Sequence, residues 1–197
     1  MSTQLFINAH IATGMPGSTA AETAAIQDIL VEDGKFISIA PHLKATLEAQ
    51  GKDMASVEGV DLGGKLVCPP FCDTHLHLDY VFTARKPGAV NESGTLFEGI
   101  QRWSETKADL TVDEIKERAK IGIAKEMRHG VQFIRSHADV TDPNLTSLKA
   151  LLELKEELKD TVTLQIVSFP QEGMYSYEGP HGESGADLVE EGLKMGA

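Results

Sequence analysis

The sequence predicts an α/β fold in which a small β region precedes a parallel sheet. One observation is that short segments with alternating apolar residues lie near the start of the chain, at residues 4–8 and 26–40. A second is the change of period after residue 65, where apolar runs of strand length alternate with helical segments. Strands that alternate with helices of this length indicate βαβ units and therefore a parallel sheet.

The β region at the start is predicted from a hairpin signal. Residues 26–40 carry alternating apolar side chains on both sides of the segment Glu32-Asp33-Gly34-Lys35. An Asp-Gly pair in this position favours a tight turn between antiparallel strands. The small and polar segment 13–25 is expected to be a loop, and residues 42–55 are expected to hold one helical turn and a further loop.

The second part of the chain begins with the segment 66–71, LVCPPF, which predicts a buried strand. Cys68 and Cys72 lie four positions apart at this strand. A disulfide at that spacing would distort an extended backbone. We therefore expect two reduced and buried thiols, since free cysteines behave as small apolar side chains.

Two more strands are expected at residues 131–140 and 161–169, and amphipathic helices at 111–130, 144–159 and 185–197. In the first of these helices Thr111 and Glu114 have the spacing of a capping box, and Gly130 follows its end. The apolar stripes predict the buried faces: Ile115, Ala119, Ile123 and Met127 in the first helix, and Leu145, Leu148, Leu152 and the stem of Lys155 in the second. Phe97, Ile100 and Trp103, also at helical spacing, are expected in the core.

Composition and charge limit the classes of function. The net charge is −12 and no run of basic residues occurs, which argues against binding to nucleic acid. No stretch approaches the roughly 20 apolar residues of a membrane span, and the first residues lack the pattern of a secretory signal. The sequence thus predicts a cytoplasmic protein, without a nucleic-acid or membrane partner, that acts on a neutral or cationic small molecule.

Polar residues follow each of the three predicted strands of the second part. They are Asp73, His75, His77 and Asp79 after the first strand, Arg135, His137 and Asp139 at the second, and Gln171 and Glu172 after the third. In parallel α/β sheets the carboxyl ends of the strands carry the chemistry, because the loops converge there. A spacing of two directs side chains of an extended chain to one face. We therefore expect these residues to meet in one site.

The His-x-His pair has two interpretations. Residues two apart on a strand project to the same side about 6 to 7 Å apart, which lets two imidazoles reach one metal ion at roughly 2 Å each. On this interpretation Asp73 or Asp79 could orient an imidazole. On the other, His75 and His77 are polar residues that close a strand. Two imidazoles do not complete a catalytic metal site, which needs at least three protein ligands.

The stretches LVCPPFCDTHLHLD, ESGTLFEGIQRW, RSHADV and LQIVSFPQEG, in this order, resemble the amidohydrolase superfamily and, within it, the cytosine deaminase branch. The resemblance runs from about residue 4 to the last residue. It implies a TIM-type (β/α)8 barrel, of which residues 65–197 would form the first three βα units. Residues 1–64 would then be the first part of a composite β-sandwich domain.

The resemblance also implies roles for individual residues. His75 and His77 are similar to the first two ligands of a single divalent metal ion, iron or zinc. Gln171 is similar to the glutamine that binds the edge of a pyrimidine, and Leu96 to the residue that covers the ring. His137 and Asp139 match a motif beneath the metal; an interior ion pair that only holds strands together is the alternative.

The implied reaction is the hydrolytic deamination of cytosine to uracil and ammonia. A complete barrel takes about 250 residues, and the proton-transferring glutamate and the later metal ligands are expected beyond Ala197. We therefore expect the chain to be part of a longer polypeptide and to be inactive alone. The alternatives are a related amidohydrolase acting on isoguanine, a triazine or another amino-substituted ring, and a non-catalytic scaffold. The resemblance leaves a homo-oligomer open.

Overall fold

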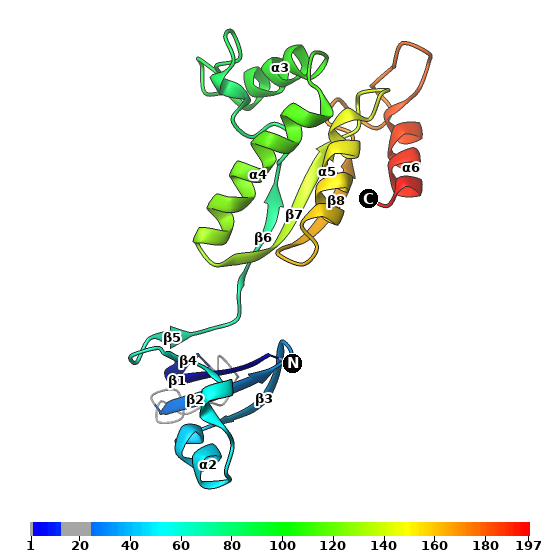
Figure 1. Ribbon diagram of the computed structural model, residues 1–197. Coiled ribbons are helices and arrows are strands. Elements are labelled where there is room, and N and C mark those ends of the chain that lie inside the picture. The colour runs from blue at the N-terminus through cyan, green and yellow to red at the C-terminus, as the bar shows by residue number, and fades with distance from the viewer. Residues whose placement is uncertain (1, 13–24) are drawn as a thin grey trace. The chain divides into compact units, whose positions relative to one another are not determined.

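The structure is a computed structural model, and it describes residues 2–12 and 25–197 (Figure 1). The expected loop at 13–25 lies almost entirely outside the described residues. The chain forms two compact units, Met1–Pro69 and Pro70–Ala197. In the described part of the chain, no helix has both the length and the apolar character needed to cross a membrane.

The first unit is built on a five-stranded sheet. Strands β1, β2 and β3 are antiparallel, and β4 and β5 both pair in parallel with β1. The expected hairpin is confirmed, because Asp33 and Gly34 both have positive φ between β2 and β3, as a two-residue turn of the Asp-Gly kind requires. The strands are β1 (Thr3–Ile11), β2 (Ile26–Glu32), β3 (Lys35–Ala40), β4 (Glu58–Asp61) and β5 (Leu66–Val67).

A small core holds this unit together. Helix α2 (Leu43–Ala49) is longer than the single turn expected from the sequence, and a short 3-10 helix, η1 (Met54–Ser56), follows it. Leu43 at the start of α2 is buried with Leu5 of β1 and Leu30 of β2. The residues of β3 are mostly exposed, so the core lies under one part of the sheet only.

The segment LVCPPF is not one buried strand, which corrects the prediction. It is divided into β5 and β6 (Phe71–Leu76), which belong to different sheets. The physical reason is the pair Pro69-Pro70, since proline has no N–H to donate to a ladder. The thiols of Cys68 and Cys72 are free but exposed, so the expectation of buried cysteines was wrong.

The second unit is an α/β structure with three parallel strands in the order β6-β7-β8. Polar residues at the carboxyl ends of all three strands therefore lie at the same edge of the sheet. The elements after β6 are η2 (Thr83–Arg85), α3 (Leu96–Lys107), α4 (Val112–Arg128), β7 (Val131–Asp139), α5 (Thr146–Glu157), β8 (Thr163–Phe169) and α6 (Gly185–Met195).

Helix α4 follows the sequence prediction closely. Thr111 and Glu114 form the capping box in both directions, and Gly130 takes the positive φ that ends the helix. The predicted stripe is buried or partly buried. In α5 the prediction is confirmed at Leu145 and Leu148, which are buried. Leu151 and Leu154 are buried as well, whereas the predicted Leu152 is only partly buried.

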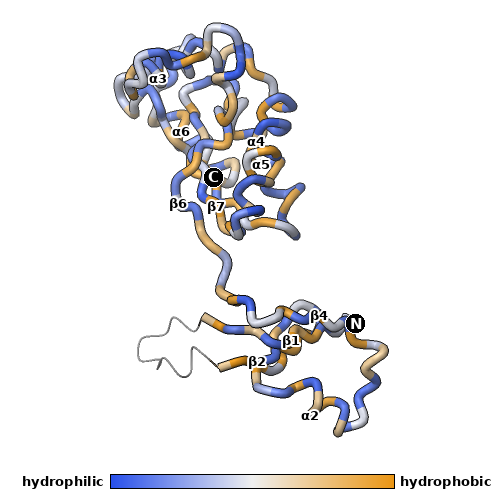
Figure 2. Tube along the Cα trace, turned by 90° about the vertical axis from the view of Figure 1, so that its left-hand side faces the viewer, coloured by the Kyte–Doolittle hydropathy of each residue, from blue (hydrophilic) through white to orange (hydrophobic). Residues whose placement is uncertain are grey.

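The core of the second unit lies between the sheet and helices α4 and α5. Both helices pack against β7, and α5 also packs against β8, as Figure 1 shows. Hydrophobic and hydrophilic segments alternate along this unit in Figure 2, consistent with helices that bury one face each. The fully buried side chains include Leu78, Ile115, Ile134, Leu148, Leu151 and Leu154.

Candidate functional site

Strand β6 brings His75 and His77 together through an irregular end. The pairing of β6 with β7 shifts between Asp73 and Leu76, so that two residues of β6 stand opposite one residue of β7. This is a β-bulge, which interrupts the regular alternation of side chains. The strand ends at Leu76, and His77 lies one residue beyond it. The ring centroids of His75 and His77 are 5.3 Å apart.

His137, near the end of β7, joins these two rings. Its ring stacks on His75 with centroids 4.3 Å apart and lies 5.6 Å from the ring of His77. The backbone oxygen of His137 is 3.1 Å from Nδ1 of His77. A carbonyl oxygen only accepts, so Nδ1 of His77 carries the proton and Nε2 presents a lone pair. We call His75, His77 and His137 the histidine cluster.

The histidine cluster favours neutral imidazoles. Burial lowers the pKa of His77, and the neighbouring His137 and His75 lower it further. Burial, with His75 close by, also lowers the pKa of His137. Nδ1 of His137 is buried and has no hydrogen-bond partner among the described residues. Neutral imidazoles with free lone pairs are the form that binds a metal ion.

Asp73 and Asp79 flank the His-x-His pair. Among the described residues, neither aspartate forms a hydrogen bond with an imidazole. Oδ1 of Asp73 accepts from the backbone N–H of His75 at 2.9 Å. The carboxylate of Asp79 is fully buried and accepts from the backbone N–H groups of Asp139, at 2.9 Å, and Tyr80, at 3.1 Å. Burial raises the pKa of Asp79 to about 7. The carbonyl of His137, and not an aspartate, orients the ring of His77.

A second polar group lies at the ends of β7 and β8. Nζ of Lys107, the last residue of α3, is 3.0 Å from Oδ2 of Asp139, 3.0 Å from Oγ1 of Thr141 and 2.5 Å from Oε1 of Glu172. We call Lys107, Asp139, Thr141 and Glu172 the lysine cluster. Asp139 therefore pairs with Lys107.

One cavity of about 540 Å³ joins the histidines to the predicted ring contacts. His75 and His77 line it together with Gln171, which follows β8, and Leu96, at the start of α3. Its aromatic lining includes Tyr80 and Phe169, whose rings lie 4.8 and 5.5 Å from that of His77, and Trp103. We call this the strand-end cavity.

Within the described residues, no three His, Cys, Asp or Glu side chains lie close enough together to hold a metal ion. The pair His75 and His77 therefore fits only part of a metal site, since a catalytic zinc or iron needs further ligands. The orphaned Nδ1 of His137 and the free lone pair of His77 agree with a missing partner at this position.

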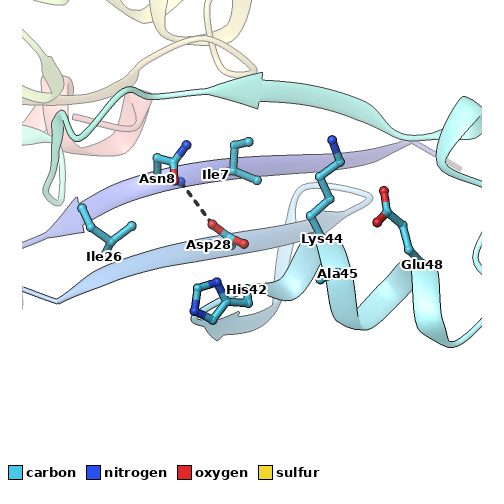
Figure 3. A pocket seen from close by; sticks show the side chains of 8 residues that line it. All are labelled: Ile7, Asn8, Ile26, Asp28, His42, Lys44, Ala45 and Glu48. Atoms are coloured by element: carbon cyan, nitrogen blue, oxygen red, sulfur yellow. Dashed lines mark hydrogen bonds between the residues drawn. The ribbon is translucent and has the colours of Figure 1, made fainter.

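The first unit has a pocket of its own, of about 500 Å³, between β1, β2 and α2 (Figure 3). Asp28 points to Asn8, and its Oδ1 accepts a hydrogen bond from the backbone N–H of Asn8 at 3.1 Å. The imidazole of His42 also lines this pocket, and Lys44 and Glu48 line the side formed by α2. This pocket has no second histidine, and it lacks the pairing of imidazoles seen in the strand-end cavity.

Sequence reasoning missed part of the site. Trp103 was expected in the core, and it is buried, but it also lines the strand-end cavity. Phe97 was also expected in the core, but its side chain is 81% exposed, so that prediction was wrong. Lys107 was not singled out. Its position four residues after Trp103, on the same face of α3, was the available signal.

The fold and the site define a class of protein: an α/β structure whose polar side chains gather at the carboxyl ends of three parallel strands. The profile of the amidohydrolase family matches residues 58–192, and the chain belongs to this family. Enzymes of the superfamily are generally metal-dependent.

The chain is also similar to individual members. It is 30% identical over 159 residues to the N-isopropylammelide isopropyl amidohydrolase of Pseudomonas sp. (strain ADP). The aligned region covers 79% of the chain and 37% of that relative. It is 28% identical over 152 residues to the pterin deaminase of Rhizobium rhizogenes, covering 75% of the chain and 32% of the relative.

Among solved structures, 5-methylcytosine deaminase from Klebsiella pneumoniae is similar over 98% of the chain. The structure liganded with phosphonocytosine has 37% identity and a TM-score of 0.78, and the match covers 42% of that protein. The structure liganded with 5-fluorocytosine has 39% identity and the same TM-score. The chain thus spans less than half the length of the relatives that it matches.

Proposed function

We propose that the protein containing this chain is a metal-dependent hydrolase that deaminates cytosine or a close derivative, such as 5-methylcytosine. The observation that carries the proposal is that the strand-end cavity brings the histidine pair together with Gln171 and Leu96. The similarity of more than 35% identity to a deaminase liganded with cytosine analogues supports the substrate class.

In this proposal His75 and His77 are two ligands of one divalent ion, iron or zinc. Nε2 of His77 is the ligand atom, because its Nδ1 is held by the carbonyl of His137. The ion would supply a water of lowered pKa as nucleophile at neutral pH. Since imidazole accepts iron and zinc alike, the residues do not select between the two metals.

Gln171 and Leu96 are the proposed substrate contacts. The amide of Gln171 offers both a donor and an acceptor, which suits an aminopyrimidine edge that presents one of each. Leu96 lies on another wall of the same cavity and is 75% exposed, so its apolar surface is available to cover a ring. Tyr80 and Phe169 provide further apolar surface beside His77.

The remaining roles follow from the arrangement of the strands. We propose that β6, β7 and β8 with their helices are the first three βα units of a (β/α)8 barrel. Residues 1–64 would contribute to a composite β-sandwich domain. His137 positions His77 through its carbonyl, and Asp139 holds α3 through Lys107. The further metal ligands and a proton-transferring glutamate would come from other parts of the protein.

The test measures ammonia release by the longest natural polypeptide that contains this chain, loaded with iron or zinc. We expect turnover of cytosine and 5-methylcytosine, and no turnover by the 197-residue chain alone. Release of ammonia by a species of this length, confirmed by intact mass, would contradict the second expectation. Absence of turnover in the longer polypeptide with either metal would contradict the first.

A second enzymatic function is favoured by the similarity to N-isopropylammelide isopropyl amidohydrolase and pterin deaminase. The protein would then act on another amino-substituted ring, with Gln171 in the same role. A comparison of kcat/KM for cytosine, isoguanine, N-isopropylammelide and pterin separates these substrates. A non-catalytic scaffold would hold no metal after purification, which elemental analysis detects directly.

A further inference from the structure

The ammonium group of Lys107 is buried at the meeting point of three elements. Its side chain is only 11% exposed. An ammonium has three N–H donors, and three oxygens accept at 2.5 to 3.0 Å, from Asp139, Thr141 and Glu172. The group therefore has no donor left for substrate or solvent. Its contacts are all within the protein, so its effect on the strand-end cavity must be exerted through its partners.

Two of the three partners of Lys107, Asp139 and Glu172, are also bonded to residues of α3, which forms a wall of the strand-end cavity. Oδ2 of Asp139 also accepts from Nε1 of Trp103 at 2.7 Å. Oε1 of Glu172 also accepts from Oγ of Ser104 at 2.8 Å. Glu172 is the neighbour of Gln171. The two carboxylates thus connect the last turns of α3 to the end of β7 on one side and to the segment after β8 on the other.

The walls of the strand-end cavity depend on this connection. Leu96 and Trp103 belong to α3, whereas Gln171 belongs to the loop after β8. Lys107 is separated from Asp139 by 32 residues and from Glu172 by 65 residues along the chain. Two converging carboxylates without a cation between them repel each other, and a buried charge without its partner is strongly unfavourable.

We propose that Lys107 is a positioning residue for ring binding: it sets the separation between the α3 wall of the strand-end cavity and Gln171 on the opposite wall. This inference rests on the proposed function. Lys107 contacts neither the histidine cluster nor the ring. It keeps Trp103 and Gln171 at the distance at which a planar heterocycle is held between α3 and the loop after β8.

The first experiment uses the 197-residue chain and does not depend on catalysis. Trp103 is the single tryptophan of the sequence, so its fluorescence reports on the α3 wall of the strand-end cavity, where its Nε1 donates to Asp139. The matched control is Lys116, whose side chain is 15% exposed and pairs with Glu153 at 2.7 Å and Glu157 at 2.5 Å between α4 and α5. Both Lys107→Met and Lys116→Met remove one cation from two carboxylates.

We expect Lys107→Met to shift the emission maximum of Trp103 and to raise its quenching by acrylamide, while Lys116→Met leaves both at the wild-type value. Lys107→Arg should restore part of the difference, because a guanidinium again neutralises both carboxylates. Equal spectra for the Lys107→Met variant and the wild type, or equal changes in the Lys107→Met and Lys116→Met variants, would overturn the inference.

The second experiment measures kinetics with cytosine in the longest polypeptide that contains the chain. We expect Lys107→Met to raise KM by about 10- to 100-fold through misplacement of the ring contacts, with bound metal unchanged and kcat affected less. A loss of activity that merely parallels loss of metal or of folded protein would show a structural role only, and so would an equal effect of Lys116→Met.

Glu172→Gln covers the case in which Lys107→Met fails to fold, because it keeps the pair of Lys107 with the buried Asp139. We expect KM and the quenching of Trp103 to rise as in Lys107→Met, but by a smaller amount. Wild-type values for both quantities would overturn the inference. If the unaltered protein deaminates no ring, the proposed function fails, and the Trp103 spectra then decide whether Lys107 controls the separation of the walls.

Discussion

Two polar clusters lie at the carboxyl ends of the same three strands, and they differ in how their hydrogen bonds are completed. The histidine cluster keeps a buried Nδ1 without a partner and a free lone pair on His77. In the lysine cluster the ammonium uses all three donors, and both oxygens of Asp139 accept from more than one group. Since buried polar groups are normally satisfied, the histidine cluster is, among the described residues, the one that fits the ligand site of the proposed function.

The same comparison separates two kinds of electrostatics. Burial lowers the pKa values of His77 and His137 and so keeps these rings neutral. The lysine cluster instead buries opposite charges against each other, with Asp139 almost inaccessible to solvent. Removing a histidine should therefore affect ligand binding, whereas removing a member of the lysine cluster should affect stability and the shape of the cavity.

The largest expected effect is on metal binding by the histidine cluster. Replacing His75 and His77 with alanine in the longest polypeptide should lower metal affinity by about 100-fold or more, because under the proposed function it removes two ligands. The free energy of unfolding of the metal-free protein should fall by only about 1 kcal/mol, for the lost hydrogen bond to the His137 carbonyl. Elemental analysis and urea unfolding measure the two quantities; undiminished metal content would remove the basis for the comparison.

The lysine cluster should show the opposite pattern. In Asp139→Asn, the amide NH2 group replaces one of the two carboxylate oxygens. It then faces either the donors of Lys107 and Trp103 or the backbone N–H of Thr141, and Lys107 loses an anionic partner. Breaking a buried ion pair costs about 3 to 5 kcal/mol, and urea unfolding should detect that loss while residual metal binding per folded molecule stays near normal. Unchanged stability would mean that the two clusters are not distinct in kind.

The pH dependence of stability should also differ between Asp79, which belongs to neither cluster, and the histidine cluster. Burial raises the pKa of Asp79 from 3.8 to about 7, so the folded state holds a proton that the unfolded state releases. Its contribution is therefore present at low pH and is lost as the pH rises from about 4 to about 7. The lowered pKa values of His77 and His137 act in the other direction, because stability falls as the pH drops below their ordinary value of 6.5.

Asp79→Asn isolates these opposing contributions. The variant should lose the decline of the unfolding free energy between pH 4 and pH 7 that comes from a raised pKa of about 7, and should retain the rise with pH that comes from the histidines. Urea unfolding at a series of pH values measures both. If the variant and the wild type have parallel pH profiles, Asp79 does not titrate in this range.

The smallest expected effect concerns the outer part of the lysine cluster. Ser104→Ala removes one donor to Oε1 of Glu172, which keeps Lys107 as partner. The free energy of unfolding should fall by about 1 kcal/mol, as for one ordinary hydrogen bond. A loss as large as that of Asp139→Asn would show that Ser104, and not the ammonium, dominates the connection between α3 and the loop after β8.

Local signals allowed much of the fold to be predicted. The Asp-Gly turn, the capping box of α4 and the strands β7 and β8 follow from residues that are neighbours in the sequence. The division of residues 66–71 into strands of two sheets was missed because an apolar run outweighed the two prolines. The buried face of α5 was predicted correctly at Leu145 and Leu148, but Leu151 and Leu154 were missed, since leucines occur on more than one side of that helix.

The candidate site was predictable only in part. The convergence of His75, His77 and Gln171 on one cavity agrees with their expected positions at strand ends, and Leu96, named from the family resemblance, lines the same cavity, while the roles of all four stay predictions. The lysine cluster was missed, because Lys107 is separated from Asp139 by 32 residues and from Glu172 by 65 residues. Its spacing from Trp103 indicates a shared face of a helix but not those partners. Long-range pairs of this kind are fixed by tertiary packing.

The bulge in β6 has a consequence for how this segment can change over evolutionary time. Between Asp73 and Leu76, two residues of β6 stand opposite one residue of β7. His75 is one of the two, so the extra residue affects the face of the strand from which its imidazole projects. A single insertion or deletion there would exchange inward and outward side chains over the rest of the strand. Divergence in this stretch should therefore proceed by replacement of residues at constant length, whereas gaps accumulate in the loops outside it.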